Sequence, residues 1–431
     1  MVRGPWSRLK SALIIFILLL TPALRAQILS GWDHAIIRQR QDSLLVLGSV
    51  SATGDMDAAF TLNRRVAKRW MFTASSLVTS RDPSYVGAVR GRPDLPFHFS
   101  TGRFLSGEIR YQGEILRFRL GRLFPDYHPF SQNTPYARET LSGDGVDWSV
   151  GRSFWRFENR IVFLKNELAD DRAVNRLFNF HALNLAFGKW SLSLGEFLIY
   201  TGINRGVDWL WSNPFVPYVL HNYDAYSDKD AGIAEYGGDS DNVMLYFRIG
   251  YTGNRFSLNT RLYLDEFQVD APDREGNVDE YLSHTQMTFF IGGQNRVSAL
   301  IPESVTLTAA FASSGFGYHR GPFTSFTTGD YFLLPSESGR IRHACFTGFW
   351  KGERWHLIFD AWAGQYADIL SLEPDQRSRK EFVKTLSSET RTGFRVRAAA
   401  QPWKNTAVAI DSRVSKENSL HTVSVVQYLN F

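Results

Sequence analysis

The chain has 431 residues, a formal net charge of +5, 44% hydrophobic residues and 14% aromatic residues. This apolar content excludes a disordered chain, which lacks the hydrophobic side chains needed for a core, and the composition is not collagen-like. Cys345 is the only cysteine, so an internal disulfide is excluded as well.

The first 26 residues have the pattern of a secretory signal peptide. Arg3, Arg8 and Lys10 precede an apolar run over 12–20, and Ala26 offers a small residue for cleavage. The run is about half as long as a membrane-spanning helix requires. We therefore predict a signal peptide over 1–26 and a mature chain over 27–431. No apolar run of about 18 residues follows, which excludes a helical inner-membrane protein.

The mature region reads as one strand after another, each alternating between apolar and polar residues. Phe247 and Ile249 alternate with Arg248 before a turn at 252–254. The next strand repeats the pattern and places Arg261 on its polar face. Alternation with period two around a Gly- or Asn-bearing turn is typical of a β-hairpin. Further hairpins are predicted around the turns 188–189 and 351–353.

The connections between these strands alternate in length along the chain. Tight turns are predicted near 112–113, 151–152, 188–189, 252–254, 351–353 and 401–405, with 293–302 as an intermediate case on the short side. Long loops are predicted near 81–96, 125–144, 166–177, 201–241, 269–281, 314–340 and 367–389. Such alternation is typical of an outer-membrane barrel with short periplasmic turns and long external loops. A soluble sandwich with Greek-key connections is the alternative, and it does not require this regularity.

The number of strands follows from counting back from the carboxy terminus. The count gives about 17 strands, the earliest near 43–53, whereas such barrels have an even number. We therefore expect one further weak strand between Ile28 and Gln41. The prediction is an all-β, antiparallel transmembrane barrel of about 18 strands, with 16 as the alternative.

The chain ends in a strand with one apolar face, on which Val423, Val425, Leu429 and Phe431 lie. This end resembles the closing strand of bacterial outer-membrane barrels, in which the final Phe is part of the assembly signal. The resemblance implies that Phe431 is the membrane-assembly signal, that the barrel assembly machinery is a partner, and that the protein resides in the outer membrane of a Gram-negative-type bacterium.

Basic residues occupy the polar faces of several predicted strands. In a barrel, polar faces line the lumen and apolar faces contact lipid, so we predict a set of lumen arginines. They are Arg117, Arg119, Arg156, Arg160, Arg395 and Arg397. In a soluble sandwich the same face would contact solvent.

The longest predicted loop, 201–241, combines aromatic and acidic side chains. Aromatic rings stack on the C–H faces of sugar rings, and carboxylates bind sugar hydroxyl groups. The predicted glycan-binding residues are Trp209, Trp211, Tyr218, Tyr223, Tyr226 and Asp224. The alternative is that the aromatic residues fill the barrel mouth or belong to an interfacial girdle. The acidic residues at 228–241 lack the spacing of an EF-hand, so no metal site is predicted.

The sequence lacks the motifs of several other functions. No G-x-S-x-G and no H-E-x-x-H occurs. Asp265 and Glu266 are adjacent, so a regular strand would direct them to opposite faces. We therefore expect no enzyme activity and no cofactor. The basic residues alternate with apolar ones instead of forming a patch, which argues against nucleic-acid binding.

The region between residues 175 and 270 resembles the capsule-assembly Wzi family of outer-membrane proteins. The features that carry the resemblance are, in order, Asn175–His181 (NRLFNFH), Leu194-Gly195-Glu196, Tyr200, Trp211–Tyr218 (WSNPFVPY), Asp241-Asn242 and Tyr263–Gln268 (YLDEFQ). Gly121-Arg122, with Pro135 in the following loop, is similar to an upstream motif of the family. The sequence departs from the family there, because Leu123–His128 stands in place of a Trp- and Gly-rich stretch.

The resemblance implies an 18-stranded, lectin-like surface protein that helps capsular or exopolysaccharide attach to the cell. We therefore expect a non-enzymatic barrel whose partners are surface polysaccharide and outer-membrane lipid. The alternative is a porin or substrate channel, which would use the same wall and a similar lumen.

Overall fold

The structure is a computed structural model. It describes residues 43–51, 56–79, 101–123, 143–164, 167–169, 172–203, 213, 217–218, 241–265, 280–291, 302–313, 316, 327–328, 331–332, 341–352, 355–367, 372, 385–403, 406–415 and 419–430. The predicted signal peptide, 1–26, lies outside the described residues.

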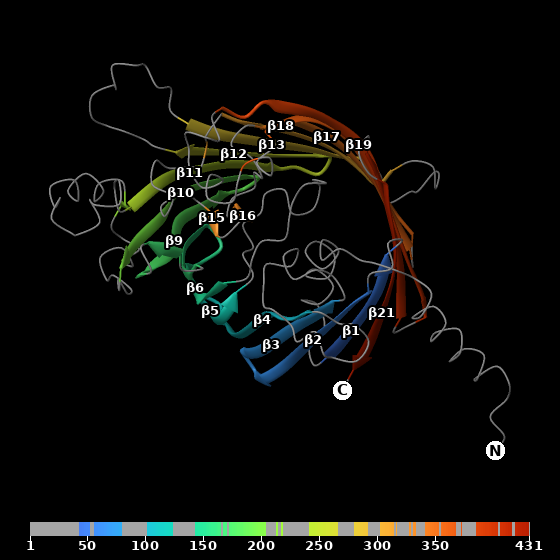
Figure 1. The fold of residues 1–431 in the computed structure, drawn as a ribbon, viewed down its shortest axis with the longest axis horizontal. Coiled ribbons are helices and arrows are strands. Elements are labelled where there is room, and N and C mark those ends of the chain that lie inside the picture. The colour runs from blue at the N-terminus through green and yellow to red at the C-terminus, as the bar shows by residue number, and fades with distance from the viewer. Residues whose placement is uncertain are drawn as a thin grey trace.

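The described residues form one large antiparallel sheet that curves into a ring (Figure 1). The strands of the amino-terminal half are β1 (Ser43–Ser51), β2 (Met56–Ala67), β3 (Trp70–Thr79), β4 (Thr101–Gln112), β5 (Leu116–Leu123), β6 (Gly143–Gly151), β7 (Trp155–Phe163), β8 (Glu167–Ala169), β9 (Arg172–Phe187) and β10 (Trp190–Ile203). Those of the carboxy-terminal half are β11 (Asp241–Thr252), β12 (Phe256–Asp265), β13 (Glu280–Phe290), β14 (Ser304–Ala312), β15 (Thr327–Thr328), β16 (Tyr331–Phe332), β17 (Ile341–Lys351), β18 (Trp355–Ala367), β19 (Ser388–Trp403), β20 (Thr406–Ser415) and β21 (Ser419–Asn430).

The ring closes because the first and last strands pair with each other. Ser43 lies opposite Asn430, and the register continues to Ser51 opposite Thr422. The sheet of the described residues has 19 strands, and β15 pairs only with β16. The short β8 follows β7 along the same edge of β9, so 18 strands make up the wall. The prediction of an all-β barrel of 18 strands is confirmed.

The even count does not depend on the predicted weak strand between Ile28 and Gln41. That segment lies outside the described residues, and β1 pairs directly with β21 without an additional strand between them. A sandwich would need two facing sheets, whereas these strands pair around one ring. Among the described residues, no helix is long and apolar enough to cross a membrane.

One face of the wall carries the large hydrophobic side chains that remain exposed. Among them are Leu183, Leu194, Ile249, Leu307, Phe346 and Phe394. Cross-strand register places Leu183 opposite Leu194, and Leu307 opposite Phe346, so these side chains share a face. Removing apolar surface from water is worth roughly 25 cal/mol per Å². This face is therefore the outer one, suited to lipid chains.

An aromatic series follows the outer face at the end of the tight turns. Trp190 lies 4.9 Å from Tyr251, Tyr251 lies 6.0 Å from Phe256, and Phe256 lies 5.4 Å from Phe289, all between ring centroids. Aromatic rings are enriched where hydrocarbon meets water. The series therefore marks one membrane interface, at the periplasmic side. Gly188, in the turn between β9 and β10, has φ 61°, a conformation that glycine adopts without strain.

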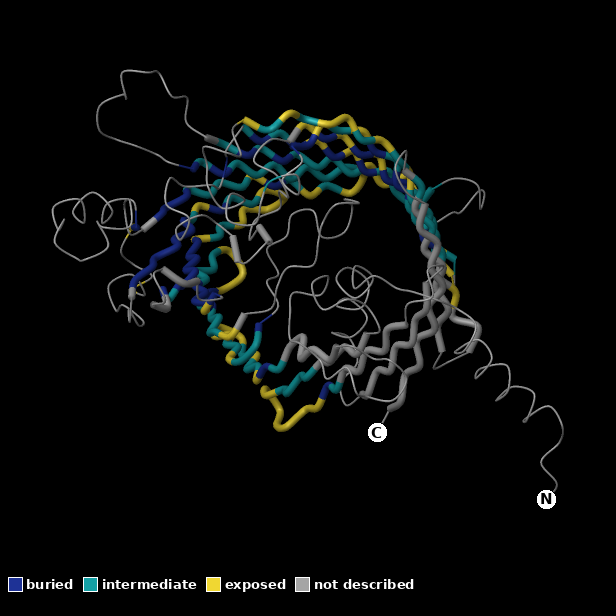
Figure 2. The backbone as a smooth tube through the Cα atoms, in the orientation of Figure 1, coloured by how far each residue is buried: buried dark blue, intermediate teal, exposed yellow. Residues whose placement is uncertain are grey.

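The opposite face of the wall lines the lumen and is rich in buried polar groups. Buried positions concentrate along β9, β10 and β11 (Figure 2). A cluster of Phe178, Phe180, Phe197 and Tyr263 packs on this inner face, together with Phe316 from the connection after β14. The β15–β16 hairpin of the same connection lies inside the ring in Figure 1. Phe316 and this hairpin therefore lie on the inner side of the wall.

Candidate functional site

Several arginines of the described lumen face are held by carboxylates of the wall. Asp147 on β6 accepts hydrogen bonds from Arg119 Nη2 on β5 at 2.6 Å and from Arg160 Nη2 on β7 at 2.5 Å. Glu108 on β4 pairs with Arg110 and lies 3.7 Å from Arg119. Arg160 is only 2% exposed, and a charge buried to this extent requires such a partner.

A second network lies across β17, β18 and β19. Arg397 Nη2 donates to Asp360 Oδ2 at 2.9 Å, and Thr347 Oγ1 donates to Asp360 Oδ1 at 2.7 Å. Arg395 lies directly opposite Asp360 in the register. Both carboxylate oxygens of Asp360 are therefore engaged, and this network rigidifies the wall.

Four lumen arginines differ from these, because no described carboxylate forms an ion pair with them. They are Arg117, Arg156, Arg248 and Arg261. The carboxylate of Glu158, two residues from Arg156 along β7, instead accepts a hydrogen bond from Asn184 Nδ2 at 2.8 Å. Asn184 in turn accepts from Ser193 Oγ at 2.6 Å. This part of the lumen therefore has an excess of positive charge.

A polar cluster lies on the outer face of β9 and β10. His181 Nε2 lies 3.2 Å from Glu196 Oε2, and the two residues are opposite each other in the register. The backbone N–H of Tyr218 donates to Glu196 Oε2 at 2.5 Å, and the Tyr218 ring lies 4.2 Å from the His181 ring. His181 and Glu196 share the face of Leu183 and Leu194, so Tyr218 covers the outer side of the wall.

Tyr218 is fully buried within this cluster. It packs with Leu177, Leu198, Tyr200 and Val243. Burial raises the pKa of the Tyr218 phenol, and the Glu196 carboxylate adds to the effect, so the phenol stays neutral. In this structure Tyr218 offers no ring face to a sugar. Tyr218 was predicted to bind a glycan, and the structure places its ring against the wall.

The other predicted glycan-binding residues, Trp209, Trp211, Tyr223, Tyr226 and Asp224, lie outside the described residues, as does Phe431. The six predicted lumen arginines fall into two groups: Arg119, Arg160, Arg395 and Arg397 lie beside Asp147 or Asp360, whereas Arg117 and Arg156 have no described carboxylate partner.

Sequence reasoning missed Arg248 and Arg261 as site residues. Both were assigned to polar strand faces, but only the register between β11 and β12 places them directly opposite each other. It also missed the role of Asp147 and Asp360. Their arginine partners lie on neighbouring strands, 28 residues away for Arg119 and 37 residues away for Arg397.

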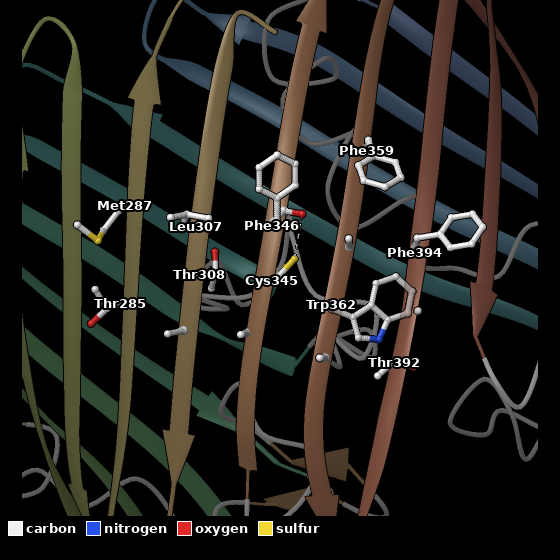
Figure 3. Close-up of a pocket in the computed structure, with 15 residues that line it drawn as sticks. Thr285, Met287, Leu307, Thr308, Cys345, Phe346, Phe359, Trp362, Thr392 and Phe394 are labelled. Carbon is white, nitrogen blue, oxygen red and sulfur yellow. Dashed lines mark hydrogen bonds between the residues drawn. The ribbon is translucent and has the colours of Figure 1, made fainter.

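A shallow groove of about 860 Å³ crosses β13, β14, β17, β18 and β19 (Figure 3). Small side chains form its floor, with Ala309 opposite Ala344 and Ala344 opposite Ala363. Larger side chains such as Phe346 and Phe394 border it. These residues belong to the outer face, so the groove faces lipid and is not a lumen site.

Comparison with known proteins identifies solved structures that share the fold of this chain. No protein-family profile and no curated protein matches the sequence. Among solved structures, the chain is similar to Wzi of Escherichia coli, an outer-membrane, carbohydrate-binding β-barrel involved in group 1 capsule assembly. The identity is 9%, the TM-score is 0.57, and the match covers 97% of this chain and 91% of Wzi.

The chain is also similar to OpdK of Pseudomonas aeruginosa, solved with vanillate. That match has 11% identity and a TM-score of 0.51, and it covers 90% of this chain and 98% of OpdK. A second structure of OpdK, also named OccK1, matches with a TM-score of 0.50 and 11% identity over the same shares of the two chains. These likenesses extend over nearly the whole chain. The chain is an outer-membrane β-barrel, and its apolar outer face places it in the outer membrane.

Proposed function

We propose that this barrel binds or anchors a surface polysaccharide, in the manner of the capsule-assembly Wzi family and without catalysis. The observation that carries the proposal is the convergence of the residues on which the sequence resemblance rests. His181 on β9, Glu196 on β10 and Tyr218 in the following connection meet in one cluster, although Tyr218 is 22 residues from Glu196 and 37 residues from His181 along the chain. Matches scattered by chance would not be expected to do so.

The binding mechanism we propose is non-covalent. Trp209, Trp211, Tyr223 and Tyr226 would stack on sugar rings, and Asp224 would accept hydrogen bonds from hydroxyl groups. The lumen arginines that have no carboxylate partner within the described part of the chain would attract the negative charge of an acidic glycan. Phe316 and the β15–β16 hairpin extend into the ring, which favours a narrowed lumen over an open pore.

The alternative is a channel for small anionic solutes. The likeness of fold to OpdK and the same arginines, which lack a described carboxylate partner, support it. A channel would conduct ions and its deletion would reduce solute uptake, whereas deletion of a polysaccharide-binding barrel would reduce surface polysaccharide.

The deciding experiment compares a deletion strain with its complemented parent. Loss of surface polysaccharide on deletion, with solute uptake unchanged, is expected. Purified barrel in planar bilayers is expected to give no large, stable openings. Unchanged surface polysaccharide together with stable openings would contradict the proposal and favour the channel.

For the external loop, the double substitution Trp209→Ala and Trp211→Ala is expected to weaken polysaccharide retention while leaving barrel assembly intact. The control is Trp190→Ala with Trp355→Ala, which removes exposed indoles at the opposite end of the wall. Retention that falls equally in both double variants would assign the loss to general damage of the barrel.

A further inference from the structure

Arg248 and Arg261 form a like-charge pair on the lumen wall. They are direct cross-strand partners on β11 and β12. Like charges placed opposite each other destabilise a sheet. Elsewhere on the described lumen face, Asp147 and Asp360 neutralise their arginine neighbours. At Arg248 and Arg261 no described carboxylate does so, and within the described residues this double positive charge is uncompensated.

The surroundings orient this pair and leave donors free. Arg248 Nε donates to Asn259 Oδ1 at 3.1 Å, which fixes the guanidinium plane while leaving its terminal nitrogens available. The Arg261 guanidinium hydrogen-bonds the side chain of Tyr263, and its buried Nε has no acceptor among the described residues. Both side chains retain partial exposure. A planar guanidinium with free N–H groups matches a carboxylate bidentately.

Aromatic side chains adjoin the pair on the same face. Tyr246 lies opposite Tyr263, with ring centroids 5.2 Å apart. Each tyrosine is two residues along its strand from the arginine, which places it on the same face. Ser193 lies opposite Arg248 on β10. The site therefore combines two cations, an amide, a hydroxyl and apolar ring surface, which is the set that a carboxylated ring compound requires. Arg248 lies four residues before the end of β11, roughly 13 Å along the strand from the turn, so the site lies inside the lumen.

We propose that Arg248 and Arg261, with Asn259, form a carboxylate-binding subsite in the lumen. If the ligand is a uronate of an acidic polysaccharide, this inference rests on the proposed function and specifies that the carboxylate of the sugar is the group bound. A small carboxylate solute presents the same group, so the test distinguishes the two sources.

The test titrates purified full-length barrel in detergent with three probes by calorimetry: an oligogalacturonate, a neutral oligosaccharide of the same length, and benzoate. The variants are Arg248→Gln with Arg261→Gln, and Arg248→Lys with Arg261→Lys, which keeps the charge but not the bidentate geometry. The control is Arg122→Gln, which removes a cation on the outer face that is paired with Asp144. Heat-modifiable electrophoresis checks that each variant is folded.

The wild type is expected to bind oligogalacturonate more tightly than the neutral probe. The double Gln variant is expected to lose about 10- to 100-fold in affinity, the double Lys variant less, and Arg122→Gln nothing. The double Gln variant is also expected to be no less stable than the wild type, because it removes a repulsive pair. A role confined to stability would give the opposite result.

Benzoate binding that shows the same dependence on the arginines, and competes with oligogalacturonate, supports the subsite and assigns it to small solutes as well. Binding of oligogalacturonate that is equal in the wild type and the double Gln variant overturns the subsite. Absence of binding by both carboxylate probes also overturns it. Either result would refute the subsite alone. The polysaccharide proposal is tested separately by the deletion strain, which lacks the whole protein.

Discussion

At the level of single residues, the contrast between Asp147 and Asp144 separates buried from exposed ion pairs. Both lie on β6 and both accept hydrogen bonds from arginines. Asp147 forms an ion pair with Arg160, and the two side chains are 16% and 2% exposed. Asp144 pairs with Arg122, and its own side chain is 62% exposed. Because water screens the exposed pair, the two carboxylates contribute very differently to stability.

We predict that Asp147→Asn lowers the free energy of unfolding by about 3–5 kcal/mol, because it leaves the charges of Arg119 and Arg160 without a counter-charge in the wall. Asp144→Asn, the matched control, is expected to cost about 0–1 kcal/mol. Urea unfolding of barrels refolded into lipid vesicles measures both. Equal losses would mean that the lumen network is as solvated as the surface pair.

At the level of elements, backbone contact between strands sets the geometry of β5. Gly121 has φ 129°, and a Cβ atom there would lie 2.1 Å from the carbonyl oxygen of Gly107 on β4. Only glycine allows the two strands to approach in this way. Gly188 also has positive φ, but no atom lies within 4 Å of a Cβ placed there.

Gly121→Ala is therefore expected to destabilise the barrel by about 2–5 kcal/mol, since it combines an unfavourable φ with a collision against backbone. Gly188→Ala carries only the conformational cost, about 1–2 kcal/mol. The same unfolding assay compares the two. A loss at Gly188 as large as that at Gly121 would show that φ alone, and not contact between β4 and β5, decides the effect.

Tyr218, in the connection between β10 and β11, is bound to the wall through Glu196. We predict that Glu196→Ala increases cleavage within 204–240 by protease added to the outside of cells, because Tyr218 and His181 both lose their partner. Glu114→Ala is the control, since the Glu114 side chain is 90% exposed in a turn. Cleavage that does not increase would mean that the packing of Tyr218 alone holds the connection.

At the level of the whole molecule, closure depends on the pairing of β1 with β21. Val425 lies opposite Gly48 on one side and Val408 on the other, so its backbone belongs to ladders in both directions. A proline there removes an N–H donor from the sheet.

We predict that Val425→Pro abolishes heat-modifiable migration of the barrel, whereas Val425→Thr, which keeps the N–H, retains it. Deleting Phe431 is expected to impair outer-membrane assembly more than synthesis, measured as barrel in the outer-membrane fraction relative to total protein. Normal insertion of the truncated chain would contradict an assembly role for this residue.

The sequence by itself determined the strands, the tight turns and the barrel class. These depend on neighbours along the chain: Phe247 and Ile249 alternate with Arg248 because a strand directs successive side chains to opposite faces. Counting strands along the chain gave about 17, and the even number came from the general rule for such barrels. The strand expected between Ile28 and Gln41 was not needed for closure.

Only the tertiary structure decided which polar groups meet. Arg248 and Arg119 both lie on polar strand faces, yet one faces another arginine and the other binds Asp147. Cross-strand register sets that difference, and a shift of one residue would send each side chain to the other face. From the sequence, Tyr218 is an aromatic residue of a long loop. Its burial against Glu196 could not be predicted, because that contact joins residues far apart along the chain.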